Sequence, residues 1–418
     1  MDMPTHWGSN TPEDWEALAA PHGTPYYLFD ADHVCSRIRA VRDALQGQAE
    51  VYYAVKANPN LALLRAVQGE ADGADISSAG ELAQAQLAGF DPAAMSFAGP
   101  AKTAAELEAA IRAGVGAISL ESPREIALCA RIAERLGQPA RVLLRVNPLA
   151  ANRAFGLKMG GKPVQFGIDE EALPAAEAQL LAERRWLDFR GLHVYVGSQC
   201  FEAAGVVEAT RNALRIVREL TQRSGLHCAK VNLGGGFGIG HGEERRELDL
   251  VALAEGLLPV LAAHRAEVAE PTALIYELGR YLTAEAGIYV TRVVSRKASR
   301  GKLFLACDGG LNHHLAAAGT FGAALRSNFA LRNLSRPEAA PVPCNLAGPS
   351  CNPTDLLAVD ASLAEPSEGD LIGVLMSGSY GLTASPILFL GRPTPAELVR
   401  TEGGIVLGRR SYTIADFN

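Results

Sequence analysis

The sequence lacks several features that mark exported, membrane-spanning or nucleic-acid-binding proteins. Its seven cysteines are scattered and form no Cys-X-X-Cys pair, so neither a zinc site nor a secreted disulfide framework is expected. No apolar run approaches the roughly 18–20 residues of a membrane span, and no basic stretch followed by an apolar one opens the chain. The net charge of −7 disfavours nonspecific binding to nucleic acid or to an anionic membrane. We therefore expect a cytoplasmic protein with neither kind of partner.

Glycine, in contrast, is abundant. It accounts for 42 of the 418 residues, against a usual share of roughly 7%, and neither a collagen period nor a Gly/Ser linker absorbs the excess. Hydrophobic residues make up 48% and charged residues 20%, as in ordinary globular proteins. The glycines are therefore expected at particular turns of a folded chain that has room for about two or three domains.

From about residue 35 to residue 280, short apolar runs alternate with alanine-rich stretches whose apolar residues have helical spacing. We expect helices such as 103–112 and 122–136, the second capped by Ser122 and opened by Pro123. The expected strands are 51–55, 117–120, 141–146, 191–196, 230–233 and 273–276. This repetition favours a closed (β/α)8 TIM-like barrel over an open doubly wound sheet.

After residue 280 the pattern changes to strands joined by Gly, Pro and Asn turns. The expected strands there are 288–294, 303–307, 370–376 and 405–407, and segment 26–29 could pair with them from the other end of the chain. The predicted fold class is therefore α/β. We predict a barrel at 35–282 and a mostly β domain assembled from 1–34 and 283–418.

Three predicted strands end in groups that can bind an anion. One is followed by glycines 234–236, another ends in Gly197 and Ser198, and a third ends in residues 277–280, which include a carboxylate and a guanidinium. Because barrel active sites lie at the carboxyl ends of strands, these groups would meet. The glycine cluster by itself fits a phosphate site and a tight turn about equally well, and it is no Walker loop.

Lys56 closes the first barrel strand in the segment 53–59. Partial burial would lower its pKa and favour the free amine that a Schiff base needs. Taken alone, however, a lysine at a strand end is usually a solvated surface charge.

In their order and spacing these motifs resemble the alanine-racemase-fold (fold type III) family of pyridoxal-phosphate (PLP) decarboxylases, which includes diaminopimelate and ornithine decarboxylases. The resemblance extends over nearly the whole chain, and no single motif decides it. The motifs are 23–25, 53–59, 73–82, 197–199, 234–236, 277–280, 307–310, 348–351 and 378–381. The resemblance implies a PLP-dependent carboxy-lyase that acts as a homodimer.

The resemblance also implies roles for individual residues. Lys56 would hold PLP as a Schiff base, and Glu277 would face the pyridine nitrogen and keep it protonated. Cys351, supplied across the dimer interface, would protonate the quinonoid carbon, with Asp355 as its companion there. The other implied cofactor-binding residues are Asp75, Arg145, Tyr195, Ser198, Gly235, Gly236, Leu278, Gly279, Arg280 and Tyr380.

Some positions depart from the family pattern. Tyr195 stands where better-known members have a histidine that stacks on the cofactor. His193, which faces the same way along the strand, either substitutes for it or is a core residue. Diaminopimelate decarboxylases hold the distal end of their substrate with an arginine and a glutamate; here alanines within 311–322 and Asn352 take these places. Losing such charge-assisted contacts argues against diaminopimelate as the substrate.

Segments 158–167 and 311–322 instead resemble a branch that contains exosortase-associated decarboxylases and the butirosin-type decarboxylase of carrier-bound glutamate. The candidate substrate-binding residues are His193, His313, Asn352 and Asp355. No metal is indicated, because His313 and His314 have no third ligand spaced nearby. We predict α-decarboxylation of an amino acid or of an aminoacyl carrier protein. The alternatives are a racemase on the same fold, a diaminopimelate decarboxylase proper and a noncatalytic PLP-binding protein.

Overall fold

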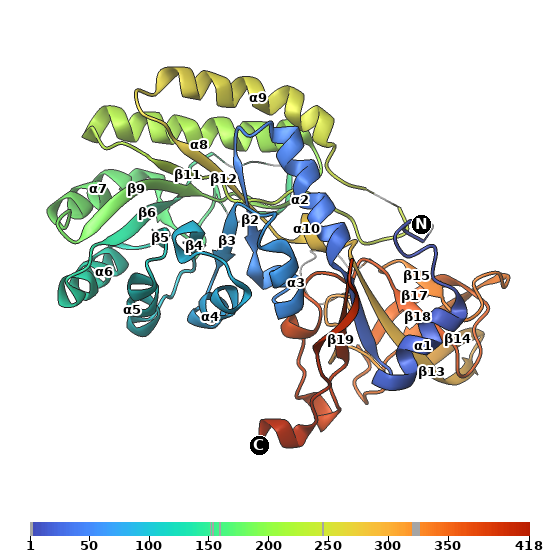
Figure 1. The fold of residues 1–418 in the computed structure, drawn as a ribbon. Coiled ribbons are helices and arrows are strands. Elements are labelled where there is room, and N and C mark those ends of the chain that lie inside the picture. The colour runs from blue at the N-terminus through green and yellow to red at the C-terminus, as the bar shows by residue number, and fades with distance from the viewer. Residues whose placement is uncertain (1–2, 151, 153, 159, 245, 320–326) are drawn as a thin grey trace.

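The computed structural model describes residues 3–418 except 151, 153, 159, 245 and 320–326. It consists of a barrel surrounded by helices and a second region built mainly of strands (Figure 1). The helices are α1 Pro12–His22, α2 Ala31–Leu45, α3 Leu61–Val67, α4 Ala79–Ala88, α5 Ala104–Ala113, α6 Pro123–Leu136, α7 Leu173–Ala182, α8 Ala203–Ser224, α9 Leu250–Glu267 and α10 Arg280–Thr283.

The barrel is a closed ring of parallel strands. In order around the ring they are β2 Glu50–Ala54, β3 Gly73–Ile76, β4 Met95–Phe97, β5 Ala117–Leu120, β6 Ala140–Asn147, β9 Leu187–Val194, β11 Lys230–Asn232 and β12 Ala273–Leu278. The β5–β6 pairing and the β12–β2 pairing complete the ring. The predicted TIM-like barrel is therefore confirmed. Strands β3 and β4 were not predicted as strands, because such short apolar runs show no periodicity.

Local capping fixes where the barrel helices begin and end. The Ser122 side chain accepts from the Glu125 amide at the start of α6, and Thr103 forms a capping box with Glu106 at the start of α5. Glycines in the left-handed conformation, Gly114 and Gly137, end the same two helices. These signals are local, so the sequence predicts both helices to within a residue.

The second region is a mixed sheet. Its strands are β1 Tyr26–Asp30, β13 Gly287–Ser299, β14 Lys302–Cys307, β15 Leu331–Asn333, β16 Pro341–Ala347, β17 Leu356–Ala364, β18 Leu371–Val374, β19 Ala396–Thr401 and β20 Gly404–Arg409. Strand β1 lies between β13, to which it is antiparallel, and β19, to which it is parallel. The predicted pairing of segment 26–29 with strands from the other end of the chain is thus confirmed. The domain boundaries at residues 35 and 282 stay a prediction.

Three short strands lie near the barrel mouth. Strand β7 (Phe155–Lys158) pairs with β10 (Gly197–Cys200) in an antiparallel hairpin, and β8 (Ile168–Asp169) adds to the end of β6. Among the helices of the described ranges, none combines the length and the apolar character that crossing a bilayer requires.

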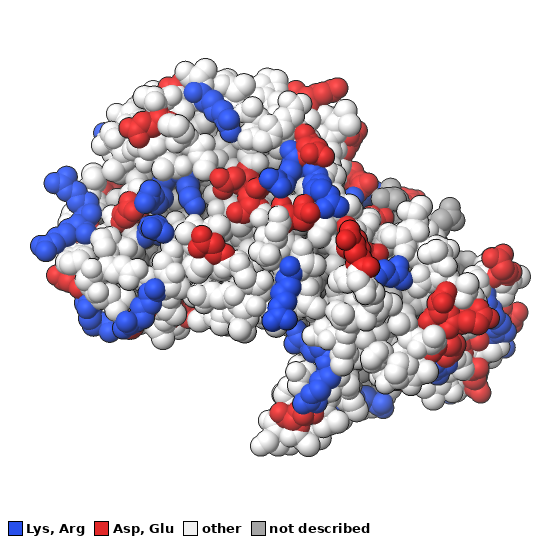
Figure 2. Space-filling view, in the orientation of Figure 1, with Lys and Arg blue, Asp and Glu red and all other residues white. Residues whose placement is uncertain are grey.

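Charged side chains occur in two settings. On the face in Figure 2 acidic and basic side chains are interspersed. Among the surface ion pairs are Arg39–Glu70 (2.6 Å) and Arg112–Glu108 (2.7 Å). Lys102 is different, because its side chain is only 1% exposed. Its ammonium donates to the carbonyls of Gly99 and Ser119 and lies 3.0 Å from Glu125, which joins α6 to the ends of β4 and β5.

Lys102→Met should therefore lower the free energy of unfolding by roughly 3–5 kcal/mol, because it leaves the buried Glu125 without its counter-charge. The measurement is urea-induced unfolding followed by circular dichroism. Arg112→Ala, which breaks an exposed helix-surface pair, is the control and should change stability much less. Equal losses in the two variants would contradict the importance assigned to the buried pair.

Candidate active site

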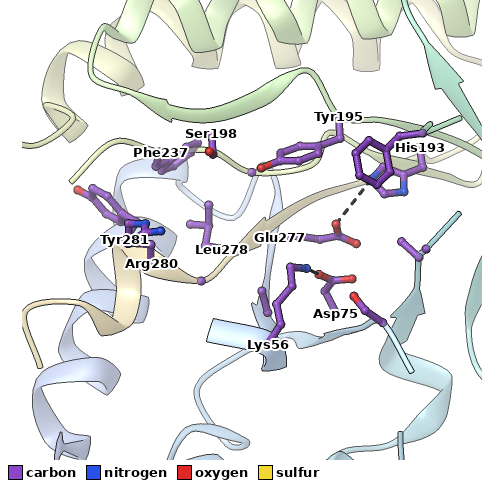
Figure 3. Close-up of a pocket in the computed structure, with 18 of the residues that line it drawn as sticks. Lys56, Asp75, His193, Tyr195, Ser198, Phe237, Glu277, Leu278, Arg280 and Tyr281 are labelled. Atoms are coloured by element: carbon purple, nitrogen blue, oxygen red, sulfur yellow. Dashed lines mark hydrogen bonds and ion pairs between the residues drawn. The ribbon is translucent and has the colours of Figure 1, made fainter. Parts of the chain in front are cut away.

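A cavity of about 480 Å³ lies at the carboxyl ends of the barrel strands (Figure 3). All predicted cofactor-binding residues line it, and so does His193. They are Lys56, Asp75, Arg145, Tyr195, Ser198, Gly235, Gly236, Glu277, Leu278, Gly279, Arg280 and Tyr380. The structure thus brings together residues that are more than 300 positions apart in sequence (Lys56 and Tyr380). The role of each residue stays a prediction.

Lys56 lies in the turn that follows β2 and points into the cavity, where its ammonium contacts the Asp75 carboxylate on β3. Burial lowers the pKa of Lys56, but the neighbouring Asp75 carboxylate, with Glu277, outweighs burial, and the net pKa is raised. The expectation that burial alone would favour the free amine is therefore wrong. The amine becomes available when Asp75 is neutralised or finds another partner.

Glu277, at the end of β12, is held at one oxygen and open at the other. Its Oε1 accepts from Ser96 Oγ at 2.8 Å and from the side-chain amide of Asn232. Burial and the charge of Asp75 raise the pKa of Glu277 to about 7, against the lowering effects of Lys56 and the two donors. A carboxylate in this setting is half ionised near neutral pH. Ser96 and Asn232 were not predicted, although Asn232 directly precedes the glycine cluster.

Arg145 also lines the cavity. Its Nη1 lies 2.8 Å from Glu121 Oε1, and Glu121 also accepts from the amides of Gly99 and Gly167. The guanidinium lies over the Phe166 ring, 5.1 Å from its centre. Both members of this ion pair are buried, so the arginine is fixed in place. Glu121 follows β5 directly, and the strand-end rule that selected Lys56 would also have found it.

Bare backbone forms the cavity end near Arg280. A Cβ at Gly235 would lie 1.9 Å from the carbonyl oxygen of Glu277, and one at Gly236 would lie 2.2 Å from that of Gly197. Glycine is therefore required at both positions, and the main chain can approach a ligand closely. The Arg280 guanidinium lies 4.8 Å from the centre of the Tyr380 ring. Tyr380 comes from the second region, where its amide donates to the Ala57 carbonyl next to Lys56.

Tyr195 lies over the glycine turn. A Cβ at Gly234 would approach its ring to 2.3 Å, so the missing side chain makes room for the phenol. Burial and the nearby Tyr380 raise the pKa of Tyr195 to about 12, which keeps the hydroxyl protonated at neutral pH. Tyr195 and His193 both reach the cavity, so the structure places the two candidates for the ring contact side by side (Figure 3).

Four predicted residues lie outside this cavity. Cys351 and Asn352 belong to the loop between β16 and β17, where the Cys351 thiol is exposed. His313 is buried in the second region, with one ring nitrogen 2.9 Å from Asn312 Nδ2 and the other 3.4 Å from the Tyr289 hydroxyl. Burial lowers its pKa to about 4. Its setting is that of a core histidine, not of a residue facing this cavity.

Asp355, the fourth, is a buried connector. Its two carboxylate oxygens accept from the amides of Leu311 (2.7 Å) and Ser350 (2.9 Å). It therefore ties the loop that carries Cys351 to the segment after Gly310. A Cβ at Gly310 or at Gly348 would lie within 2.4 Å of its carboxylate, which explains both glycines. Residues 159 and 320–322 of the two segments compared above lie outside the described residues.

The lining fits an elongated ligand that carries an aldehyde at one end and an anion at the other. Lys56 supplies an amine, and Arg280 with the glycine backbone supplies a cationic end. Within the described ranges, two buried atoms beside the cavity have no hydrogen-bond partner, Asp75 Oδ1 and His193 Nε2. Buried polar atoms are rarely left unpaired without a functional reason.

Residues 31–284 match the family model described as the pyridoxal-binding domain of pyridoxal-dependent decarboxylases. The chain is 37% identical over 407 residues to the L-glutamyl-(BtrI acyl-carrier protein) decarboxylase of Niallia circulans, covering 96% of this chain and 94% of the relative. It is 34% identical over 374 residues to the diaminopimelate decarboxylase of Pseudomonas aeruginosa, covering 88% and 86%. The crystal structure of the diaminopimelate decarboxylase of M. jannaschi superposes with a TM-score of 0.88 at 28% identity, covering 96% and 92%.

Asp75→Asn should lower the pKa of Lys56, because it removes the carboxylate that stabilises the ammonium while burial remains. We expect Lys56 to be labelled faster by an amine-reactive reagent near pH 8, in protein stripped of pyridoxal phosphate and analysed by mass spectrometry. Lys102, paired with Glu125, is the internal control and should be labelled at an unchanged rate. An unchanged or slower labelling of Lys56 would contradict this account of the pair.

Proposed function

The chain belongs to the pyridoxal-dependent decarboxylase family, and from that premise we propose that it removes the α-carboxyl group of an aminoacyl group attached to an acyl carrier protein. The proposal rests above all on the convergence of Lys56, from the end of β2, with Glu277 and Arg280, from the end of β12, on one cavity. Pyridoxal 5'-phosphate is the cofactor of the family.

The cavity residues form two groups. One group would hold the ring of the cofactor and its point of attachment, and the other would hold its phosphate. Lys56 would be the attachment point, with Asp75 beside it, and Glu277 would partner the pyridine nitrogen. Arg280 and the hydroxyls of Ser198 and Tyr380 would hold the phosphate, together with the backbone of Gly235, Gly236 and Gly279. Once bound, the cofactor withdraws the electron pair that the departing carboxylate leaves on Cα.

Side chains of the protein supply and accept the protons of the reaction. Asp75 lies beside Lys56 and would stabilise its amine as the ammonium whenever that amine is free. When the bond between Cα and the carboxylate breaks, carbon dioxide leaves and a proton must replace it on Cα. We assign this proton to the thiol of Cys351 of a second subunit, and solvent then restores the thiol. An exposed thiol outside the cavity of its own chain fits such a role.

Charge around the cavity favours a substrate without a second free carboxylate. Lys56 is paired with Asp75 and Arg145 with Glu121, while Arg280 lies at the phosphate end. In the segment after Gly310, Ala316 and Ala317 are buried alanines. A distal carboxyl in thioester linkage needs no cation, and the α-carboxyl must stay free for the reaction. The carrier is therefore attached through the distal carboxyl.

The substrate prediction is tested by measuring carbon dioxide release from glutamate in thioester linkage, through its distal carboxyl, to an acyl carrier protein. Free glutamate and meso-diaminopimelate are the comparison substrates. We expect kcat/KM for the carrier-bound form to exceed the others by about 100-fold or more, since a site that lacks charged partners discriminates against charged groups. Efficient turnover of diaminopimelate would contradict the substrate assignment, and inversion at Cα without carbon dioxide release would establish a racemase.

The dimer prediction is tested by mixing two inactive variants. Lys56→Ala lacks the attachment point and should lose the visible absorption of the bound cofactor, whereas Cys351→Ala should stay coloured but turn over slowly. If each site uses Cys351 of a second subunit, co-expression should restore about a quarter of the wild-type activity. Cys351→Ala co-expressed with the Lys56→Ala/Cys351→Ala double variant is the control, because it keeps Lys56 but has no Cys351 in either subunit. Activity no higher than this control would contradict the shared site.

A further inference from the structure

His193 occupies an unusual position at the floor of the cavity. Its side chain is 1% exposed, and its Nδ1 lies 2.9 Å from Ser119 Oγ on β5, which β6 separates from β9 in the ring. Its Nε2 has no hydrogen-bond partner within the described ranges and points toward Glu277 Oε2, 3.6 Å away (Figure 3). The buried His313, by comparison, has a polar partner at each ring nitrogen.

The second feature is the carboxylate oxygen of Glu277 that lies nearest to His193. Ser96 and Asn232 both donate to Oε1, so Oε2 is the oxygen that faces His193. Several charged or titratable groups surround this pair from the adjoining elements. They are Asp75 on β3, Lys56 after β2, Tyr52 on β2, Tyr195 after β9, Arg145 on β6 and Lys102 before α5.

We propose that His193 is a positioning residue that donates its Nε2 proton to Glu277 Oε2 and thereby keeps this carboxylate ionised where it faces the pyridine nitrogen. The inference rests on the role of Glu277 proposed above. The separation of 3.6 Å is longer than a hydrogen bond, and contacts of this kind commonly tighten when a site is filled.

The surroundings of His193 select the form that can donate. Burial and the charges of Arg145, Lys56 and Lys102 hold the pKa of His193 well below its ordinary value, so the ring is neutral and carries one proton. The carboxylate favours that proton on Nε2, and the Ser119 hydroxyl then donates to Nδ1. A neutral imidazole can donate a hydrogen bond to the ionised Glu277 without carrying a charge of its own. An imidazolium at this place would add a further cation to a site that already holds Lys56 and Arg145.

The consequence concerns the titration of Glu277, whose pKa is raised to about 7. A donor at Oε2 favours the ionised form, so removing the donor raises the pKa further. At a fixed pH near 7 a smaller fraction of Glu277 is then ionised. The cofactor then loses part of its attraction to the Glu277 carboxylate. In any pH profile that depends on Glu277, the fall on the acidic side moves to higher pH.

The test uses the holoenzyme with His193→Leu, His193→Gln and Ser119→Ala. The readouts are the pH titration of the visible absorption band and the dissociation constant of pyridoxal phosphate, neither of which requires substrate. His193→Leu should move the band titration upward by about one pH unit and weaken cofactor binding about tenfold, the loss of one hydrogen bond to a charged group. His193→Gln keeps a side-chain N–H donor and should restore most of both. Ser119→Ala removes the hydroxyl that favours the His193 tautomer with its proton on Nε2. It should shift the band titration in the same direction by a smaller amount.

His264→Leu is the matched control. His264 on α9 is another buried histidine whose Nε2 has no partner within the described ranges, but it does not line this cavity. Its replacement should leave the titration and the dissociation constant unchanged, whatever it does to thermal stability.

Two outcomes overturn the proposal. One is a His193→Leu variant, or a Ser119→Ala variant if the first does not fold, with wild-type titration and affinity. The other is a His193→Gln variant as impaired as His193→Leu, which would make the ring and not the donor essential. Glu277→Gln separates this failure from a failure of the proposed function. If Glu277→Gln leaves the band titration unchanged, the assigned role of Glu277 is wrong. If Glu277→Gln changes the titration but the His193 and Ser119 variants do not, only the role of His193 is wrong.

Discussion

Closure of the parallel barrel is the constraint on which the rest of the molecule depends. The pairings β12–β2 and β5–β6 use up the last free edges of the ring, and a closed ring leaves every strand with its carboxyl end on the same rim. Lys56, Asp75, Glu121, Arg145, His193 and Glu277 all occupy strand ends or positions directly beyond them. Their meeting at one cavity follows from hydrogen bonding of the main chain, before any contact between the side chains themselves.

Charge is the second organising principle of this rim. Lys56 faces Asp75, Arg145 faces Glu121 and Lys102 faces Glu125, each cation beside a carboxylate from a different element. Buried charges need such partners because desolvation is costly. The charges also set the chemistry, since neighbouring negative charge raises the pKa of Lys56, and burial together with Asp75 raises that of Glu277. The site is therefore an electrostatic network in which removing one member alters the protonation of the others.

Strand-end reasoning found much of this arrangement in the sequence. It located Lys56, the glycine cluster and residues 277–280, and local capping signals located α5 and α6. It missed β3 and β4, which are too short for periodicity, and with β4 it missed Ser96. The pKa of Lys56 was predicted in the wrong direction, because burial can be judged from a strand's apolar character whereas the opposing carboxylate depends on the register of the next strand. The buried settings of His313 and Asp355 arise from long-range packing that no local pattern reveals.

The position of β1 has a consequence for biosynthesis. This strand precedes the barrel strands in the chain, yet both of its neighbours follow them, β13 after residue 286 and β19 after residue 395. While the barrel segments emerge from the ribosome, β1 keeps two unpaired edges, which invite association with other nascent chains. Its five residues are buried in the finished protein. Strand β19 therefore completes the pairing of β1, and a chain that stops short of β19 leaves one edge of β1 unpaired.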